Sequence, residues 1–157
     1  MRPQPVRMCD RFEAYQERLS ARAMTPAERS IAACLWESGP EMLELRAAGA
    51  VLEDDERLAV AARIRVAAED PPFLLVTDRR VVHAAPGLLR WRIRRELPLG
   101  RVTAVEMTGP GLLRPPSLRF AASGLQGLVV RLHEGEQEME VLRDRLPRIF
   151  GPAYRER

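Results

Sequence analysis

The chain has 157 residues, enough for one ordinary hydrophobic core or for a small domain with an additional helical segment. Apolar residues make up 46% and charged residues 30%, which is typical of folded water-soluble proteins, and the formal net charge is +3. No apolar run reaches the roughly 18–20 residues needed to span a bilayer. The N-terminus lacks the apolar region of a secretory signal, so we expect a cytoplasmic protein. All 25 basic residues are arginine, which is typical of a high-GC bacterium.

Residues 1–52 are predicted to form about three helices. Thr25-Pro26-Ala27-Glu28 marks the start of the second, with threonine as N-cap, proline at the first position and glutamate at the third. Ser38-Gly39-Pro40 ends that helix, and a third short helix runs from about residue 41 to 49. The first helix carries an apolar stripe that needs a covering surface, and this candidate assembly stripe comprises Met8, Phe12, Tyr15 and Leu19.

From residue 53 onward the apolar period changes from helical to alternating, which predicts strands. Four acids, Glu53 to Glu56, precede the first strand. In the fourth strand Trp91, Ile93 and Leu97 are expected on one face, opposite the arginines. The predicted strands lie near residues 58–66, 73–77, 81–85, 91–97, 101–108, 118–120 and 128–132.

A final amphipathic helix is predicted after Gly135. Its apolar face comprises Met139, Leu142, Leu146 and Ile149 at helical spacing. Pro147 is expected to kink this helix or to end it early, because proline lacks the N–H that an interior position requires.

Three segments carry a resemblance to a known family. Residues 73–82, FLLVTDRRVV, resemble the hairpin of bacterial PH-like and GRAM-like domains, residues 96–106 resemble the following strand pair, and residues 53–58 resemble the acidic lead-in to strand one. The resemblance covers about residues 53–150. It implies an α+β fold: a seven-stranded antiparallel PH-like β-barrel at 53–157 with a C-terminal capping helix, preceded by the helical extension 1–52. It also implies a non-catalytic module that binds protein or lipid and is frequently oligomeric.

Arginine is concentrated in one part of the chain. Nine arginines and two acids lie between residues 79 and 119, a net charge of +7, whereas the remainder of the chain carries −4. This asymmetry indicates an anionic partner, or else a solvated sheet face on which arginine stems cover apolar surface. Turn chemistry alone also accounts for Asp78, Arg79 and Arg80. The candidate anion- or partner-binding residues are Arg79, Arg80, Arg90, Arg92, Arg94, Arg95, Arg114 and Arg119.

A Gly- and Pro-rich loop at 109–116 separates two predicted strands. Leu112 and Leu113 stand at its tip, next to Arg114. Leucines at such a tip either contact a membrane interface or a partner groove, or they cap the open end of the barrel. Leu112 and Leu113 are therefore the candidate partner- or membrane-contacting loop.

The cysteines and histidines give no recognisable site. Cys9, Cys34, His83 and His133 lack the local spacing of a zinc site, so we expect two reduced thiols, no metal and no cofactor. Either cysteine could form a catalytic pair with either histidine, but no local sequence motif supports such a pair. The P-loop, dinucleotide-binding, zinc-protease and GxSxG motifs do not occur, so no enzyme is predicted.

A helix-turn-helix reading of the N-terminal helices is disfavoured by charge. Residues 1–52 carry seven arginines and seven acids, and the would-be recognition helix carries Glu41 and Glu44, which repel phosphate. We therefore expect no nucleic-acid partner.

Two hypotheses follow. In the first, the protein is a PH-like adaptor that docks on a protein partner or on copies of itself through its N-terminal helices. In the alternative, it is a peripheral module that binds anionic membranes through an arginine-rich sheet face and the Leu112-Leu113 loop.

Overall fold

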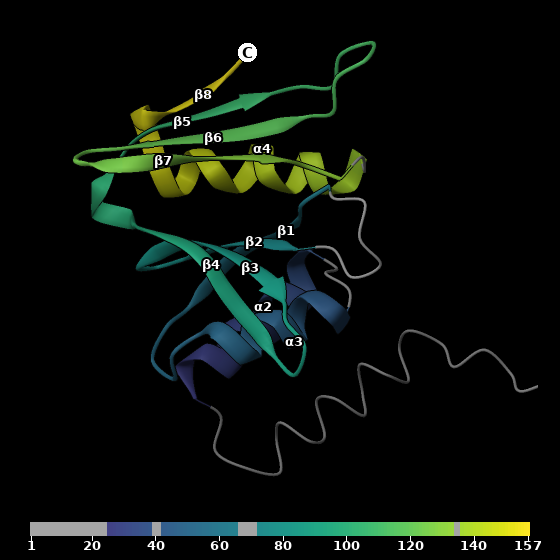
Figure 1. Cartoon of the computed structure of the whole chain (residues 1–157), viewed down its shortest axis with the longest axis vertical. Coiled ribbons are helices and arrows are strands. Elements are labelled where there is room, and N and C mark those ends of the chain that lie inside the picture. Colours follow the sequence, from purple (N-terminus) through teal and green to yellow (C-terminus); the bar gives the residue numbers. More distant parts are fainter. Residues whose placement is uncertain (1–24, 39–41, 66–71, 134–135) are drawn as a thin grey trace, which may run out of the picture.

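The computed structural model describes residues 25–38, 42–65, 72–133 and 136–157, and Figure 1 shows their arrangement. The predicted stripe Met8, Phe12, Tyr15 and Leu19 lies outside these residues, as does Cys9. The elements are α2 (Pro26–Ser38), α3 (Met42–Val51), β1 (Leu58–Arg63), β2 (Phe73–Thr77), β3 (Arg80–Pro86), β4 (Trp91–Pro98), η1 (Leu99–Arg101), β5 (Val102–Thr108), β6 (Ser117–Ala122), β7 (Leu125–Arg131), α4 (Glu136–Phe150), η2 (Gly151–Ala153) and β8 (Tyr154–Glu156).

Helix α2 begins where its capping sequence predicts. The Thr25 hydroxyl accepts a hydrogen bond from the Glu28 backbone N–H at 3.2 Å. The Glu28 carboxylate accepts one from the Thr25 N–H at 3.1 Å, which completes a reciprocal capping box. Two N–H groups that have no partner within the helix are thereby satisfied, and the predicted helix start is confirmed.

The strands form two sheets and not one closed barrel. One sheet has the order β1-β2-β3-β4 and is antiparallel throughout; the other has the order β7-β6-β5-β8, in which the short β8 pairs parallel to β5. The 3-10 turn η1 carries the chain from the first sheet to the second, so β4 and β5 do not pair. The sheets are joined at one corner by the isolated bridge between Ile64 and Leu132. The prediction of a closed seven-stranded antiparallel barrel is therefore wrong, although its seven strands are found as β1 to β7.

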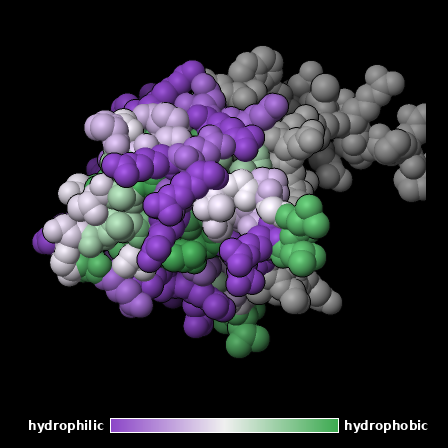
Figure 2. Space-filling model, turned by 90° about the horizontal axis from the view of Figure 1, so that it is seen from above, coloured by the Kyte–Doolittle hydropathy of each residue, from purple (hydrophilic) through white to green (hydrophobic). Residues whose placement is uncertain are grey.

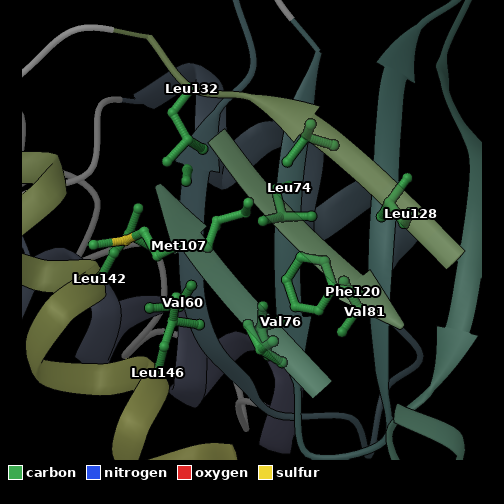
Figure 3. Close-up of a cluster of buried hydrophobic side chains, with 14 of the residues drawn as sticks. Val60, Leu74, Val76, Val81, Met107, Phe120, Leu128, Leu132, Leu142 and Leu146 are labelled. Carbon is green, nitrogen blue, oxygen red and sulfur yellow. The ribbon is translucent and has the colours of Figure 1, made fainter. Parts of the chain in front are cut away.

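The main core lies between the two sheets. It is built from the inward-facing residues of both, including Leu74, Val81 and Phe120, and is closed by Leu142 and Leu146 of α4 (Figure 3). Helix α4 contacts the edge strands β1 and β8 and so fills the gap between the sheets on that side (Figure 1). The fold is thus α+β, with two sheets and a C-terminal helix.

A second core lies on the outer face of the first sheet, which α2 and α3 cover (Figure 1). Phe73, Leu75 and Val82 point to this side and pack against Ile31 and other residues of the helices. All five residues of β2 are consequently buried, because one face lies on the main core and the other lies under the helices. The helices therefore complete the core of the strand region.

Helix α4 continues past Pro147 to Phe150, so the predicted early end is wrong. Proline removes only one backbone hydrogen bond in the last turn. Leu146 is fully buried just before it, and the Phe150 ring lies 5.9 Å from the ring of Phe120. This packing holds the final turn. Among the described residues, no helix combines the length and apolarity required to cross a membrane.

Candidate functional site

Arg80, one of the predicted binding residues, forms a buried ion pair. Its Nε and Nη2 donate to the two carboxylate oxygens of Glu56 at 2.9 and 2.8 Å, and Glu56 is fully buried. Arg80 also donates to Glu96 and to the backbone carbonyl of Val51. Its guanidinium is therefore occupied by groups of this chain, and it joins the end of α3 to the first sheet.

The same carboxylate accepts further hydrogen bonds. The Thr77 hydroxyl donates to Glu56 at 2.7 Å, and the Glu53 N–H donates to it at 3.1 Å. Burial alone raises the pKa of Glu56, but the hydrogen bonds from Arg80, Thr77 and Glu53 outweigh it, so the pKa lies below its ordinary value of 4.5. Glu56 is therefore held as a carboxylate.

Arg79 is also paired with the acidic segment, although it remains on the surface. Its guanidinium donates to Glu53 at 3.0 Å and to Asp55, and the hydrogen bond to Asp55 raises the pKa of Arg79. The turn itself is capped by the Thr77 hydroxyl, which accepts from the N–H groups of Arg79 and Arg80. The Asp78 carboxylate accepts instead from the Arg57 N–H at 3.0 Å, outside the turn.

A β-bulge in β4 changes which residues share a face. The register skips Arg94, because His83 is opposite Arg95 and Ala84 is opposite Ile93. Leu97 therefore lies in the main core, whereas Trp91 lies on the outer face, where its ring is 5.2 Å from that of Phe73. The prediction that Trp91, Ile93 and Leu97 share one face is wrong, because a single extra residue reverses the alternation.

The eight predicted arginines do not form one sheet face. Arg95 donates to the Gln126 carbonyl at 2.8 Å across the corner between β4 and β7. Others lie on the β3–β4 hairpin, on the β5–β6 connection and on β6. Those that are exposed and form no ion pair with any described residue are Arg90, Arg92, Arg94, Arg114 and Arg119.

The predicted loop leucines are fully exposed. Leu112 and Leu113 have exposed fractions of 104% and 94%, so they do not cap an opening of the fold. A second pair that sequence reasoning missed, Leu88 and Leu89, is exposed to 99% and 98% in the β3–β4 connection. Seen from above, hydrophobic side chains form small protruding patches on a largely hydrophilic surface (Figure 2). The signal for the second pair is present in the sequence, since residues 86–90 and 110–114 both read PGLLR.

The two glycines of this repeat differ in what surrounds them, which gives a matched test. A Cβ atom at Gly87 would lie 2.6 Å from the Arg90 carbonyl oxygen, whereas one at Gly111 would meet only the Arg114 Cβ at 3.8 Å. We expect Gly87→Ala to lower the free energy of unfolding by about 1–3 kcal/mol, through backbone displacement. Gly111→Ala should change it by less than about 0.5 kcal/mol. Urea unfolding of both variants checks this, and equal losses would contradict it.

Neither Cys34 nor His83 is part of a recognisable catalytic arrangement. Cys34 is buried, and its thiol donates to the Leu58 carbonyl at 3.5 Å. The Nε2 atom of His83 is buried without a hydrogen-bond partner; burial, and then the charge of Arg94, lower the pKa of this imidazole. Within the described ranges no three Cys, His, Asp or Glu side chains come together as metal ligands.

A shallow hollow of about 310 Å³ lies at the start of α2 and is lined by Pro26, Arg29, Ser30 and Arg57. Its one hydroxyl is already used, because the Ser30 Oγ donates to the Ala27 carbonyl and accepts from the Leu58 N–H. The hollow therefore presents two surface arginines and no free buried polar group.

Comparison with known proteins gives similarity at the level of structure only. No family model matches the chain, and no curated protein matches it. A DUF1696 family protein with a pleckstrin-homology domain from Shewanella loihica PV-4 is 20% identical, with a TM-score of 0.47 over 65% of this chain and 86% of that chain. A pleckstrin-homology domain from Shewanella amazonensis SB2B is 17% identical, with a TM-score of 0.45 over 64% and 88%. The hSac2 domain of the human phosphoinositide phosphatase Sac2 is 12% identical, with a TM-score of 0.43 over 68% and 79%.

Proposed function

We propose that this protein is a non-catalytic docking module that contacts its partner through the tips of two hairpins. The observation that carries the proposal is the nearly complete exposure of four leucines, Leu88, Leu89, Leu112 and Leu113, at those tips. Moving a leucine side chain out of water is favourable, so a hairpin tip that exposes two of them almost completely is suited to association.

The helices α2 and α3 cover one face of the first sheet and leave the hairpin tips uncovered. They already cover the outer face of the first sheet, where Ala47 and Ala48 are fully buried. Their contribution is thus to the fold, and the docking surface lies elsewhere on the described part of the chain. The stripe from Met8 to Leu19 stays a prediction as a separate assembly element, with a protein partner or a second copy as its occupant.

Site-specific photo-crosslinking in intact cells tests the proposal. A photoreactive phenylalanine analogue is placed at Leu89, at Leu113 and, as the control, at Leu125. Leu125 is 46% exposed and begins β7, at the end of the second sheet opposite to the β5–β6 connection. We expect crosslinks to a macromolecule, whether protein or lipid, from positions 89 and 113 and none from 125. Equal labelling at all three positions, or none at any, would remove the proposal.

A further inference from the structure

The outer face of the second sheet is open, whereas that of the first sheet is covered. Helices α2 and α3 pack on the outer face of the first sheet, and α4 contributes Leu142 and Leu146 to the core between the sheets. No described helix lies on the side of β5, β6 and β7 that is turned away from the first sheet (Figure 1). The side chains on this side therefore face solvent and are accessible to a partner.

Side chains alternate along each strand, which assigns the residues of this outer face. Met107 of β5, Phe120 of β6 and Val130 of β7 are buried in the main core, so the residues next to each of them point outward. The register aligns these outward residues across the sheet in two rows. One row contains Val129, Arg119, Glu106 and Arg155, and the row nearer the β5–β6 connection contains Arg131 and Ser117.

The face is cationic, because among the described residues four arginines share it with a single acid. Glu106 is already paired, since the Arg157 Nε lies 3.3 Å from one of its carboxylate oxygens. Arg119, Arg131 and Arg155 are exposed and form no ion pair with any described residue. Four arginines and one glutamate give the face a net charge of +3. Three guanidinium groups therefore keep their donors for groups outside this chain.

The surface beside these arginines is flat. Ala104 and Ala121 lie directly opposite each other on β5 and β6, and both are exposed. Seen from above the second sheet, long hydrophilic side chains lie across a paler surface (Figure 2). Because small side chains let another backbone approach the strands closely, the face has room for a polypeptide segment next to its arginines.

Charge restricts what can occupy this face. A second copy that docked through the same face would bring arginines against arginines, which is unfavourable. Residues 1–24 carry five arginines and three acids, so this segment is basic as well. Proteins hold single-stranded nucleic acid by stacking its bases on aromatic side chains, and none of the outward residues assigned above is aromatic. Carboxylates fit, because a guanidinium group binds a carboxylate through two parallel hydrogen bonds.

From these features we infer that the outer face of the second sheet binds an acidic segment of a protein partner, with its carboxylates on Arg119, Arg131 and Arg155. Strand geometry places the Cα atom of Arg119 about 8 Å from that of Arg131 and about 10 Å from that of Arg155. Acids on successive turns of a helix, or on alternate residues of an extended chain, have spacings of this order. This site is separate from the hairpin tips and from Leu125 at the start of β7, so it adds to the proposed docking function.

Fluorescence anisotropy of a labelled oligoglutamate, titrated with the full chain, tests this site. We expect binding that weakens as salt is added, because exposed charges are screened over about 8 Å at physiological ionic strength. Arg119→Glu/Arg131→Glu should weaken binding about tenfold, since two attractive contacts become repulsive. In NMR spectra, the backbone amides of β5, β6 and β8 should shift on titration, and those of the hairpin tips should not.

A matched charge reversal separates this site from the positive charge of the whole chain. Arg92→Glu/Arg94→Glu changes the net charge by the same amount on β4, where both arginines are exposed. It should leave the affinity for oligoglutamate within about twofold, because β4 belongs to the other sheet. All four arginines are exposed, so thermal unfolding should not change in either double variant.

Three results would overturn the assignment. The first is equal loss of binding in the two charge-reversed variants, because binding would then follow net charge alone. The second is absence of oligoglutamate binding at low salt. The third is tighter binding of a single-stranded RNA or of phosphatidylglycerol vesicles, lost in Arg119→Glu/Arg131→Glu, because the face would then belong to a different class of partner. The crosslinks expected from positions 89 and 113 do not depend on any of these results, so the proposed function is tested separately.

The hairpin tips supply one more control. Leu112→Ser/Leu113→Ser should leave oligoglutamate binding unchanged, because these leucines lie beyond the end of the sheet. Loss of binding in this variant would place the acidic segment at the β5–β6 tip and not on the sheet face.

Discussion

Glu56→Ala is expected to lower the free energy of unfolding by about 3–5 kcal/mol, because it leaves the guanidinium of Arg80 without its buried partner. Glu56 is fully buried, and the side chain of Arg80 is only 16% exposed, so water cannot replace the lost carboxylate. The Thr77 hydroxyl also loses its acceptor at 2.7 Å. Denaturant unfolding at neutral pH measures the loss.

Two comparisons identify the cause of this loss. Asp144→Ala breaks an exposed pair with Arg148, whose side chains are 55% and 75% exposed, and should change stability by no more than about 0.5 kcal/mol. Replacing Glu56 and Arg80 together by methionine should be milder than Glu56→Ala, because no buried charge is left unpaired. A Glu56→Ala variant within about 1 kcal/mol of the wild type would contradict the assigned role.

The same pair gives the wild type an acid-sensitive component of stability. The folded-state pKa of Glu56 is lowered, so below its ordinary value of 4.5 the unfolded chain takes up the proton first. The contribution of Glu56 is therefore fully present above that pH and is lost as the pH falls through the folded-state value. Glu56→Ala should remove this part of the acid dependence, which unfolding curves across the acid range would detect.

Removal of residues 1–52 is expected to prevent residues 53–157 from forming an ordered core. The truncation uncovers Phe73, Leu75, Val82 and Ala84, each of which is fully buried beneath the helices. Full burial of one large apolar side chain contributes about 1.5–3 kcal/mol, and a whole domain is stable by only about 5–15 kcal/mol. We expect poor near-UV circular dichroism and binding of a hydrophobic dye, and a cooperatively unfolding, soluble fragment would contradict this.

A point substitution in the full chain tests the same interface without truncation. Ala48 is fully buried against the sheet, whereas Ala50, two residues later in α3, is exposed. Ala48→Glu should destabilise the protein severely, because it places a carboxylate in an apolar interface without a partner. Ala50→Glu should have an effect below about 1 kcal/mol. The predicted division of the chain at residue 52 stays a prediction. The truncation and the Ala48→Glu variant both test whether the segments on either side of it fold separately.

Local chemistry was predictable from the sequence where a few neighbouring residues decide it. The capping box at Thr25 and Glu28 specifies the helix start through two hydrogen bonds within one turn. Alternation likewise located the strands, because a half-buried strand repeats every two residues. These features depend on sequence neighbours alone.

Features decided by distant pairing were not predictable in the same way. The bulge at Arg94 is visible only in the register between β3 and β4, and it moved Leu97 to the opposite face from Trp91. Strand β8 is short and polar, and it exists because the free edge of β5 accepts it. In the sequence, the acids at 53–56 are recognisable only as a lead-in to the first strand. In the structure, Glu56 forms an ion pair with Arg80, which lies 24 residues further along the chain.

The candidate site was predictable in part. The tip at Leu112 and Leu113 was identified from composition, whereas Leu88 and Leu89 stood in a stretch that reads as an ordinary hairpin turn. Comparison of the two PGLLR segments is the step that links them. Of the predicted arginines, Arg79 and Arg80 are paired with acids of this chain, which sequence spacing does not reveal.

The complete burial of β2 has a consequence for how the chain reaches its fold. Its five residues, FLLVT, carry no charge and no proline, and such a segment associates readily with copies of itself when it is exposed. On the ribosome α2 and α3 emerge before β2, so the layer that shields its outer face is already available when the strand appears. The order of the elements along the chain thus shortens the time for which this segment faces other nascent chains.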